Sequence, residues 1–186
     1  MKLHKIIFIS FLAIAINSSA QLRPTDLDKS PMDMSYSPQN YPILKMNGNA
    51  VSEPSARVIY SRPQKSGRQI FGNIVAYDQV WRLGANEATE IEFFRNVSIN
   101  DKKVAKGRYT MYAICSEIKW TVIFNNEKDV WGLAYNSKKD VLRVDLPVQH
   151  SDDIVEAYTM YFEDTKSGTT LNILWDDVKV SMPITF

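Results

Sequence analysis

Length and composition limit what this chain can be. With 186 residues, of which 45% are hydrophobic and 23% charged, it has room for one domain with a sizeable core and is unlike a disordered chain. Its formal net charge of +1 gives no electrostatic reason to expect binding to nucleic acid or to an anionic membrane surface.

The N-terminal residues 1–20 have the order of a secretory signal peptide. Lys2 and Lys5 precede an apolar run from Ile6 to Ile16, and small residues ending at Ala20 follow it. The apolar run is well short of the roughly 20 residues that a membrane-spanning helix needs, and no cysteine near the cut offers a lipid anchor. We therefore predict an exported protein, periplasmic or secreted, that has no membrane span and is cleaved after Ala20.

The next segment, residues 21–54, is rich in proline. It holds five of the eight prolines of the chain: Pro24, Pro31, Pro38, Pro42 and Pro54. Proline has a fixed φ and no backbone donor, so this density disfavours both helix and central strand. We predict an extended N-terminal arm, which either lies along the domain or is a spacer between leader and domain.

From residue 55 to residue 186 the sequence has the pattern of β-strands. Apolar side chains recur at every second position, as at Ile91 and Phe93 between acidic residues and throughout 178–186. Turn residues separate the apolar runs, for example at residues 166–168. No segment of about ten or more residues has the periodicity of an amphipathic helix. These patterns predict a single all-β domain, an antiparallel β-sandwich or barrel-like fold.

The chain offers few residues for metal or nucleophilic chemistry. His150 is the only histidine after the leader, and it lies in a polar stretch that we expect to be a surface loop. Cys115 is the only cysteine, and its apolar neighbours predict a buried thiol. We expect neither residue to be catalytic. We also expect no metal and no cofactor, because metal-ligand clusters, phosphate-binding glycine loops and dinucleotide fingerprints are missing from the sequence.

The stretch from Tyr60 to Thr89 carries the side chains that best fit a binding site. It is the least strand-like part of the domain, and Gly67, Gly72 and Gly84 allow its backbone to fold back. Arginine has a rigid donor fork that suits carboxylates and phosphates, and a tryptophan beside it can stack on a sugar ring. The candidate ligand-binding residues are Arg62, Arg68, Trp81, Arg82, Asn86, Glu87 and Thr89.

Two arrangements of these residues are open. In the first, Arg82 and Glu87 face one concave site together with Arg62 or Arg68, because clustered arginines repel one another unless an anion lies among them. In the second, the residues are structural: Arg82 pairs with Glu87 or Glu90 inside the domain, and Trp81 belongs to the core.

Several short runs resemble a known family. They include Val80-Trp-Arg82, Gly84–Thr89 and Trp131-Gly132, and the likeness extends from about residue 55 to residue 186. In these runs the chain resembles domain-of-unknown-function family 2911, exported bacterial proteins frequent in Bacteroidetes. The resemblance supports a site at the residues named above and implies no substrate. Leu83 departs from the threonine expected there, which argues against a polar role for it, and Cys115 departs from the usual proline.

Three classes of function fit the sequence. The first is a binding module for a small anionic or carbohydrate ligand, or for a partner protein. The second is a hydrolase in which Glu87 works with another carboxylate, Asp78 or Glu90. The third is a structural component of an envelope assembly that docks through the N-terminal arm. The scarcity of histidine and of metal ligands favours the binding module over catalysis.

Overall fold

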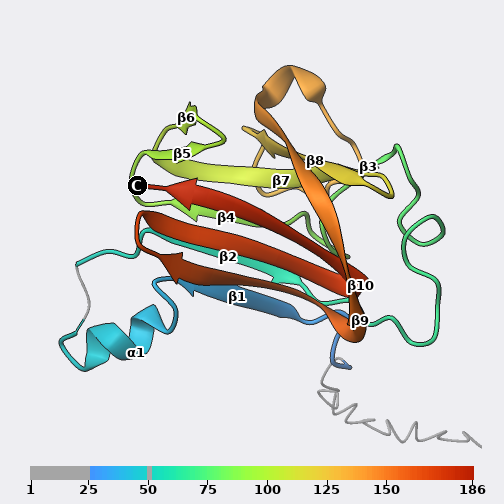
Figure 1. The fold of residues 1–186 in the computed structure, drawn as a ribbon, viewed down its shortest axis with the longest axis horizontal. Helices are drawn as coiled ribbons and strands as arrows, with labels where there is room; N and C mark the ends of the chain where they lie inside the picture. Colours follow the sequence, from blue (N-terminus) through green and yellow to red (C-terminus); the bar gives the residue numbers. More distant parts are fainter. Residues whose placement is uncertain (1–25, 50–51) are drawn as a thin grey trace, which may run out of the picture.

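The computed structural model describes residues 26–49 and 52–186 (Figure 1). The predicted leader and its cut after Ala20 lie outside the described residues. The elements are β1 (Met32–Ser37), α1 (Tyr41–Met46), β2 (Ala56–Ser61), β3 (Val80–Trp81), β4 (Glu90–Phe93), β5 (Val97–Ile99), β6 (Lys102–Val104), β7 (Gly107–Cys115), β8 (Lys119–Asn125), a 3-10 turn (Ser137–Lys139), β9 (Asp140–Thr165) and β10 (Gly168–Thr185). The predicted all-β antiparallel fold is confirmed.

One antiparallel sheet of ten strands makes up the body of the molecule. The strand order is β1-β2-β4-β7-β8-β9-β10-β5-β6, and β3 pairs with β7 outside this path. The sheet is open rather than closed, but it curls until β1 lies beside β9, where the amide of Phe162 donates to Ser35 Oγ at 3.3 Å. The two layers that result enclose the apolar core, as a sandwich or barrel-like fold requires (Figure 1).

The curl comes from β9 and β10, which double back together at one end of the molecule (Figure 1). In β10 the buried side chains change phase, from Trp175 and its odd-numbered neighbours to the even-numbered series that begins at Val178. The ladder has a β-bulge there: the stretch of β10 from Leu174 to Val178 faces the longer stretch of β9 from Thr159 to His150, so the extra residues lie on β9, and Asp176 on β10 has φ 57°. On β9 the register moves from Val155 to His150 across the same point, so both strands bend there.

Part of the proline-rich arm belongs to the sheet. β1 pairs with β2 from Met32 opposite Ser61 to Ser37 opposite Ala56. The prolines flank this edge strand instead of interrupting it, and Pro42 lies at the start of α1, where a missing backbone donor costs nothing.

The core contains an aromatic cluster under the end of the molecule where β3 lies. It consists of Phe71, Trp81, Trp120, Tyr158 and Trp175, whose ring centroids lie 5.2 to 6.4 Å apart in the contacting pairs. Such ring pairs add to the free energy of plain apolar burial. No helix among the described residues is long and apolar enough to cross a membrane.

The structure confirms the prediction for Cys115 and corrects the one for His150. Cys115 is buried, as predicted, and burial raises the pKa of its thiol far above the usual value, so the group stays neutral. The prediction that His150 lies in a surface loop is wrong, because His150 is part of β9 and pairs with Val178. Its Nδ1 lies 2.8 Å from Asp177 Oδ2 at the exposed bend of the two strands. Charged residues in a bent, solvated strand look like a loop in sequence.

Candidate functional site

The segment between β2 and β3 is pinned to the molecule by backbone bonds and apolar side chains. The amide of Lys65 donates to Glu156 O at 2.7 Å, and the amide of Tyr158 donates to Pro63 O at 2.9 Å. Ile70, Phe71 and Val75 are buried in the core. This segment is therefore an ordered covering over one end of the sheet, and its charged side chains have defined surroundings.

Arg62 joins three parts of the fold. Its guanidinium lies 3.0 Å from the Asp33 carboxylate in β1, and it donates to Tyr158 O at 3.2 Å and to Thr159 Oγ1 at 2.9 Å. All of these partners lie at the seam between β1 and β9. The donors of Arg62 are thus used in holding the curled sheet together.

Arg68 serves its own loop. It is exposed and donates to the carbonyl groups of Lys65, at 3.0 Å, and Gln64. These bonds close the turn that contains Ser66 and Gly67, both of which have positive φ. In the described part of the chain no bond joins Arg62 or Arg68 to Arg82 or Glu87.

Trp81 belongs to the core, as the structural alternative expected. Its ring stacks on Trp175 at a centroid distance of 6.0 Å, and its Nε1 donates to Gly84 O at 3.0 Å. The partly buried indole therefore packs against the core and supports the following turn.

The turn at residues 82–89 is held by a dense set of bonds. Thr89 is buried, its hydroxyl donates to Leu83 O at 2.5 Å, and its amide donates to Arg82 O at 3.1 Å. Ser61 Oγ accepts from the amide of Ala85 at 2.7 Å and donates to the carbonyl of the same residue. A Cβ at Gly84 would lie 2.7 Å from that hydroxyl oxygen, so the close approach requires glycine. Thr89 is thus a support of the turn.

Arg82 differs from every other arginine in the predicted site. It is half-buried, and its Nε is buried without a hydrogen-bond partner. Within the described residues its guanidinium makes no hydrogen bond or ion pair with any side chain or carbonyl. Burial lowers the pKa of Arg82, because the charged form loses water contacts there. An arginine nevertheless stays protonated in proteins, so an incompletely solvated cation remains.

The predicted partners of Arg82 are engaged elsewhere or free. Glu90 lies 3.5 Å from Arg108 and accepts from the amide of Asp129 at 3.0 Å. Glu87 is exposed, and it has no bonded partner in the part of the chain that the structure describes. The structural alternative, in which Arg82 pairs with Glu87 or Glu90, is therefore wrong.

Asn86 links the turn to the N-terminal arm. It has φ 55°, and its side chain lies near the carboxylate of Asp28. The pKa of Asp28 is lowered, first by the amide of Ser30, which donates at 2.7 Å, and next by Asn86. The segment before β1 therefore runs past the turn that carries Arg82.

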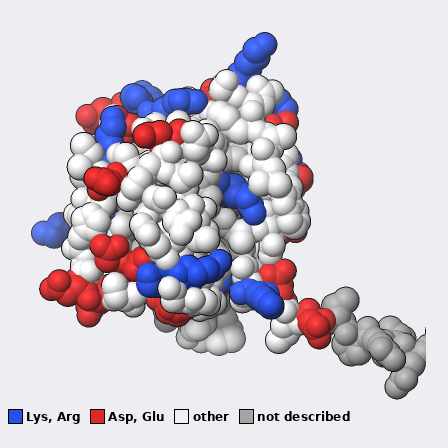
Figure 2. Space-filling view, turned by 90° about the vertical axis from the view of Figure 1, so that its right-hand side faces the viewer, with Lys and Arg blue, Asp and Glu red and all other residues white. Residues whose placement is uncertain are grey.

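Figure 2 looks onto the end of the molecule that lies at the right of Figure 1. It shows a basic side chain set in a hollow among uncharged residues, apart from the mixed acidic and basic groups around the rim.

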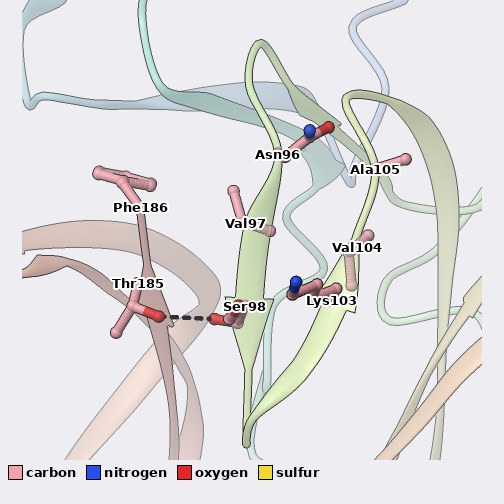
Figure 3. A pocket seen from close by; sticks show the side chains of 8 residues that line it. All are labelled: Asn96, Val97, Ser98, Lys103, Val104, Ala105, Thr185 and Phe186. Carbon is pink, nitrogen blue, oxygen red and sulfur yellow. Dashed lines mark hydrogen bonds between the residues drawn. The ribbon is translucent and has the colours of Figure 1, made fainter.

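A second hollow, of about 470 Å³, lies at the opposite end between β5, β6 and the end of β10 (Figure 3). It contains none of the predicted site residues, and Lys103 is the only charged residue that lines it. β10 and β5 are joined there by a single residue pair, Thr185 and Ser98, whose Oγ1 and O lie 3.4 Å apart. The hollow is thus the place where the sheet seam opens, and its polar lining residues are Asn96, Ser98, Lys103 and Thr185.

The loop that follows β8 lies against the Arg82 turn, and none of its residues is among the predicted site residues. The amide of Ala88 donates to Val130 O at 3.1 Å, which lays this loop on the Arg82 turn. The signal for it was present in the sequence, because Trp131-Gly132 is one of the runs that carry the family resemblance. Within the described residues no group of three or more His, Cys, Asp or Glu side chains is placed to hold a metal ion.

The chain belongs to the family described as "Protein of unknown function (DUF2911)", which matches residues 44–184. The resemblance seen in the sequence is thereby confirmed. Comparisons with curated proteins and with solved structures gave no match. The family description assigns no activity, so any statement of function depends on the site itself.

Proposed function

We propose that the protein is an exported binding module that holds a small anionic ligand at Arg82. The observation that carries the proposal is the half-buried guanidinium whose Nε has no partner and which no carboxylate neutralises within the described residues. Burying a cation without a partner is costly. A carboxylate or phosphate group bound at this position supplies the missing acceptor, and the planar fork of arginine suits both groups.

A comparison with Arg57 supports the distinction between two kinds of arginine. In one kind, here called a strut, a partner inside the fold compensates the charge; in the other, the charge is left for a ligand. Arg57 also has a buried Nε without a partner, but its Nη2 lies 2.6 Å from the Glu92 carboxylate. Its charge is therefore compensated inside the fold, whereas the charge of Arg82 is not.

The surroundings of Arg82 favour binding over hydrolysis. The bonds of Thr89 and Ser61 fix the turn before any ligand arrives, which lowers the entropy cost of binding. Glu87 is exposed on the same turn and is an acceptor for ligand hydroxyl groups. A two-carboxylate hydrolase would need a second acid beside Glu87. Of the two candidates, Glu90 is engaged with Arg108 and the amide of Asp129, and Asp78 is exposed in the loop before β3.

Calorimetric titration at constant ionic strength tests this function. Sodium phosphate, sulfate, acetate and citrate are titrated into the wild type, into Arg82→Met and into the control Arg68→Met. Methionine keeps an apolar stem and removes every donor. We expect at least one anion to bind the wild type and Arg68→Met, and none to bind Arg82→Met. Equal binding by Arg82→Met, or no binding of any anion to the wild type, would overturn the proposal.

Export has its own support and its own test. The order of basic, apolar and small residues in 1–20 supports a leader cleaved after Ala20. Expression of the full chain in a Gram-negative host, followed by intact mass measurement of the periplasmic and medium fractions, should give a protein that starts at Gln21. Recovery of the uncleaved chain in the cytoplasm alone would contradict export.

A further inference from the structure

The loop at residues 126–136 covers the stem of Arg82 with its backbone. Gly132 has φ +83°, and a Cβ built on it would lie 2.7 Å from Ala88 Cβ, 3.0 Å from Arg82 Cβ and 3.2 Å from Arg82 Cδ. Such distances leave no room for a side chain, so the loop backbone packs directly on the arginine stem. The residue before this glycine, Trp131, is consequently a neighbour of Arg82.

Trp131 is the odd member among the four tryptophans. Trp120 and Trp175 are each 1% exposed, and Trp81 is packed among them, whereas Trp131 is 52% exposed. In the described part of the chain its ring contacts no other aromatic ring and no cation. A large indole face therefore lies open to solvent on the residue next to the glycine that packs on the stem of Arg82. Tryptophan exposed in this way is typical of contact surfaces.

We propose that Arg82 and Trp131 form the two halves of one site for an acidic sugar, with the guanidinium on the carboxylate and the indole against the sugar ring. This inference rests on the proposed function and names the ligand class for the same site. A carboxylate joined to a ring places an anion and a flat apolar face a few bonds apart, which matches two side chains held together through Gly132.

The polar groups of the turn select a sugar ring over an aromatic ring. Glu87 is an exposed acceptor without a bonded partner in the described residues, and it lies on the turn that carries Arg82. A sugar acid has hydroxyl groups to donate to such an acceptor, whereas an aromatic acid has none and brings only repulsion between its carboxylate and Glu87.

Tryptophan fluorescence and calorimetry with four probes test the assignment. The probes are sodium glucuronate (acid and sugar ring), glucose (ring without acid), acetate (acid without ring) and benzoate (acid on an aromatic ring). We expect glucuronate to bind the wild type about tenfold or more tighter than any other probe. Trp131→Ala should lower the glucuronate affinity to that of acetate and leave acetate binding unchanged. Arg82→Met should remove binding of both acids.

Leu133→Ala is the matched control, because Leu133 is 73% exposed in the same loop. This variant should bind glucuronate like the wild type, and thermal melts should show that all three variants are folded. If acetate binds through Arg82 but glucuronate binds no tighter, or if Trp131→Ala has no effect, the sugar assignment fails while the anion site stands. If benzoate binds tightest through Trp131, the ligand is an aromatic acid. If no anion binds, the anion site itself fails.

Discussion

Arg62 and Arg82 lie on adjacent backbone segments, because the hydroxyl group of Ser61, the residue before Arg62, accepts a hydrogen bond from the amide of Ala85 in the Arg82 turn. The contacts of their guanidinium groups nevertheless differ. Arg62 has three acceptors at the β1–β9 seam, whereas the guanidinium of Arg82 has none among the described residues. The difference teaches that residue type and sequence proximity do not separate a strut from a binding group. What separates them is whether the fold supplies a partner for the charge.

The largest effect concerns the loop that covers Arg82. Gly132→Ala should destabilise the protein by about 2–3 kcal/mol, because the new Cβ meets Ala88 and the Arg82 stem at a positive φ. Urea-induced unfolding measures the loss. Gly67→Ala is the control, since Gly67 has φ +69° but nothing within 4 Å, and it should lose only about 1 kcal/mol. Equal losses at both positions would show that the loop does not pack on Arg82.

Removing the strut should cost less. Arg62→Met leaves the Asp33 carboxylate and Tyr158 O without their donor, so we expect a loss of about 2 kcal/mol in the free energy of unfolding. The partly exposed ion pair alone would be worth less than that. Denaturant titration at pH 7 checks the value, and an unchanged stability would remove the contrast with Arg82.

A third arginine, Arg143, extends the comparison, because the stability that its contact with Tyr135 contributes depends on pH. It donates to Tyr135 Oη at 2.6 Å, and Tyr135 donates to Asp140 at 2.5 Å. Burial, and then the bond to Asp140, raise the pKa of Tyr135 to about 12. The fold thus favours the neutral phenol, so its contribution is complete below the unfolded pKa of about 10 and is lost as pH rises through about 12.

Tyr135→Phe tests this dependence. The variant should be less stable than the wild type by about 1 kcal/mol below pH 10, and the difference should shrink as pH rises toward 12. Unfolding curves of both proteins at several pH values between neutrality and pH 12 measure it. A difference that stays constant over the whole range would mean that Tyr135 does not titrate as described.

The smallest effect on stability should come from Arg82 itself. Arg82→Met keeps the stem that packs under Gly132 and removes a buried donor without a partner, so stability should change by less than about 0.5 kcal/mol or rise slightly. Paired with Arg62→Met in the same denaturation assay, it gives the contrast directly. A loss as large as that of Arg62→Met would make Arg82 a second strut.

Much of the fold was predictable because alternation at one face of a strand is a local property. Ile91 and Phe93 are buried between half-buried acids, as their spacing predicts. The doubling back of β9 and β10 was not predicted, because it depends on extra residues of β9 between His150 and Thr159, and the polar run 151–153 among them looks like a loop. The strand β1 was not predicted either, because an edge strand needs few apolar residues and prolines lie on both sides of it.

The turn that carries Arg82, Asn86 and Glu87 could be located from the sequence, but the contacts of the candidate side chains could not. Arg82, Asn86 and Glu87 do lie on one turn, and the close approach of Gly84 to Ser61 explains the glycine there. The engagement of Arg62 could not be inferred, because its partner Asp33 lies 29 residues away in the arm. Pairing across a curled sheet is a property of the tertiary fold, which no local pattern contains.

The doubling back of β9 and β10 also sets the order in which the chain can fold. The turn between Thr165 and Gly168 joins neighbours in sequence, but Ser37 meets Asp164 across 127 residues and Thr185 meets Ser98 across 87. Contacts between distant residues form slowly, because closing long loops costs chain entropy first. A nascent chain therefore cannot cover its core until residues 160–185 have been made, although local hairpins such as β7 with β8 can pair before then.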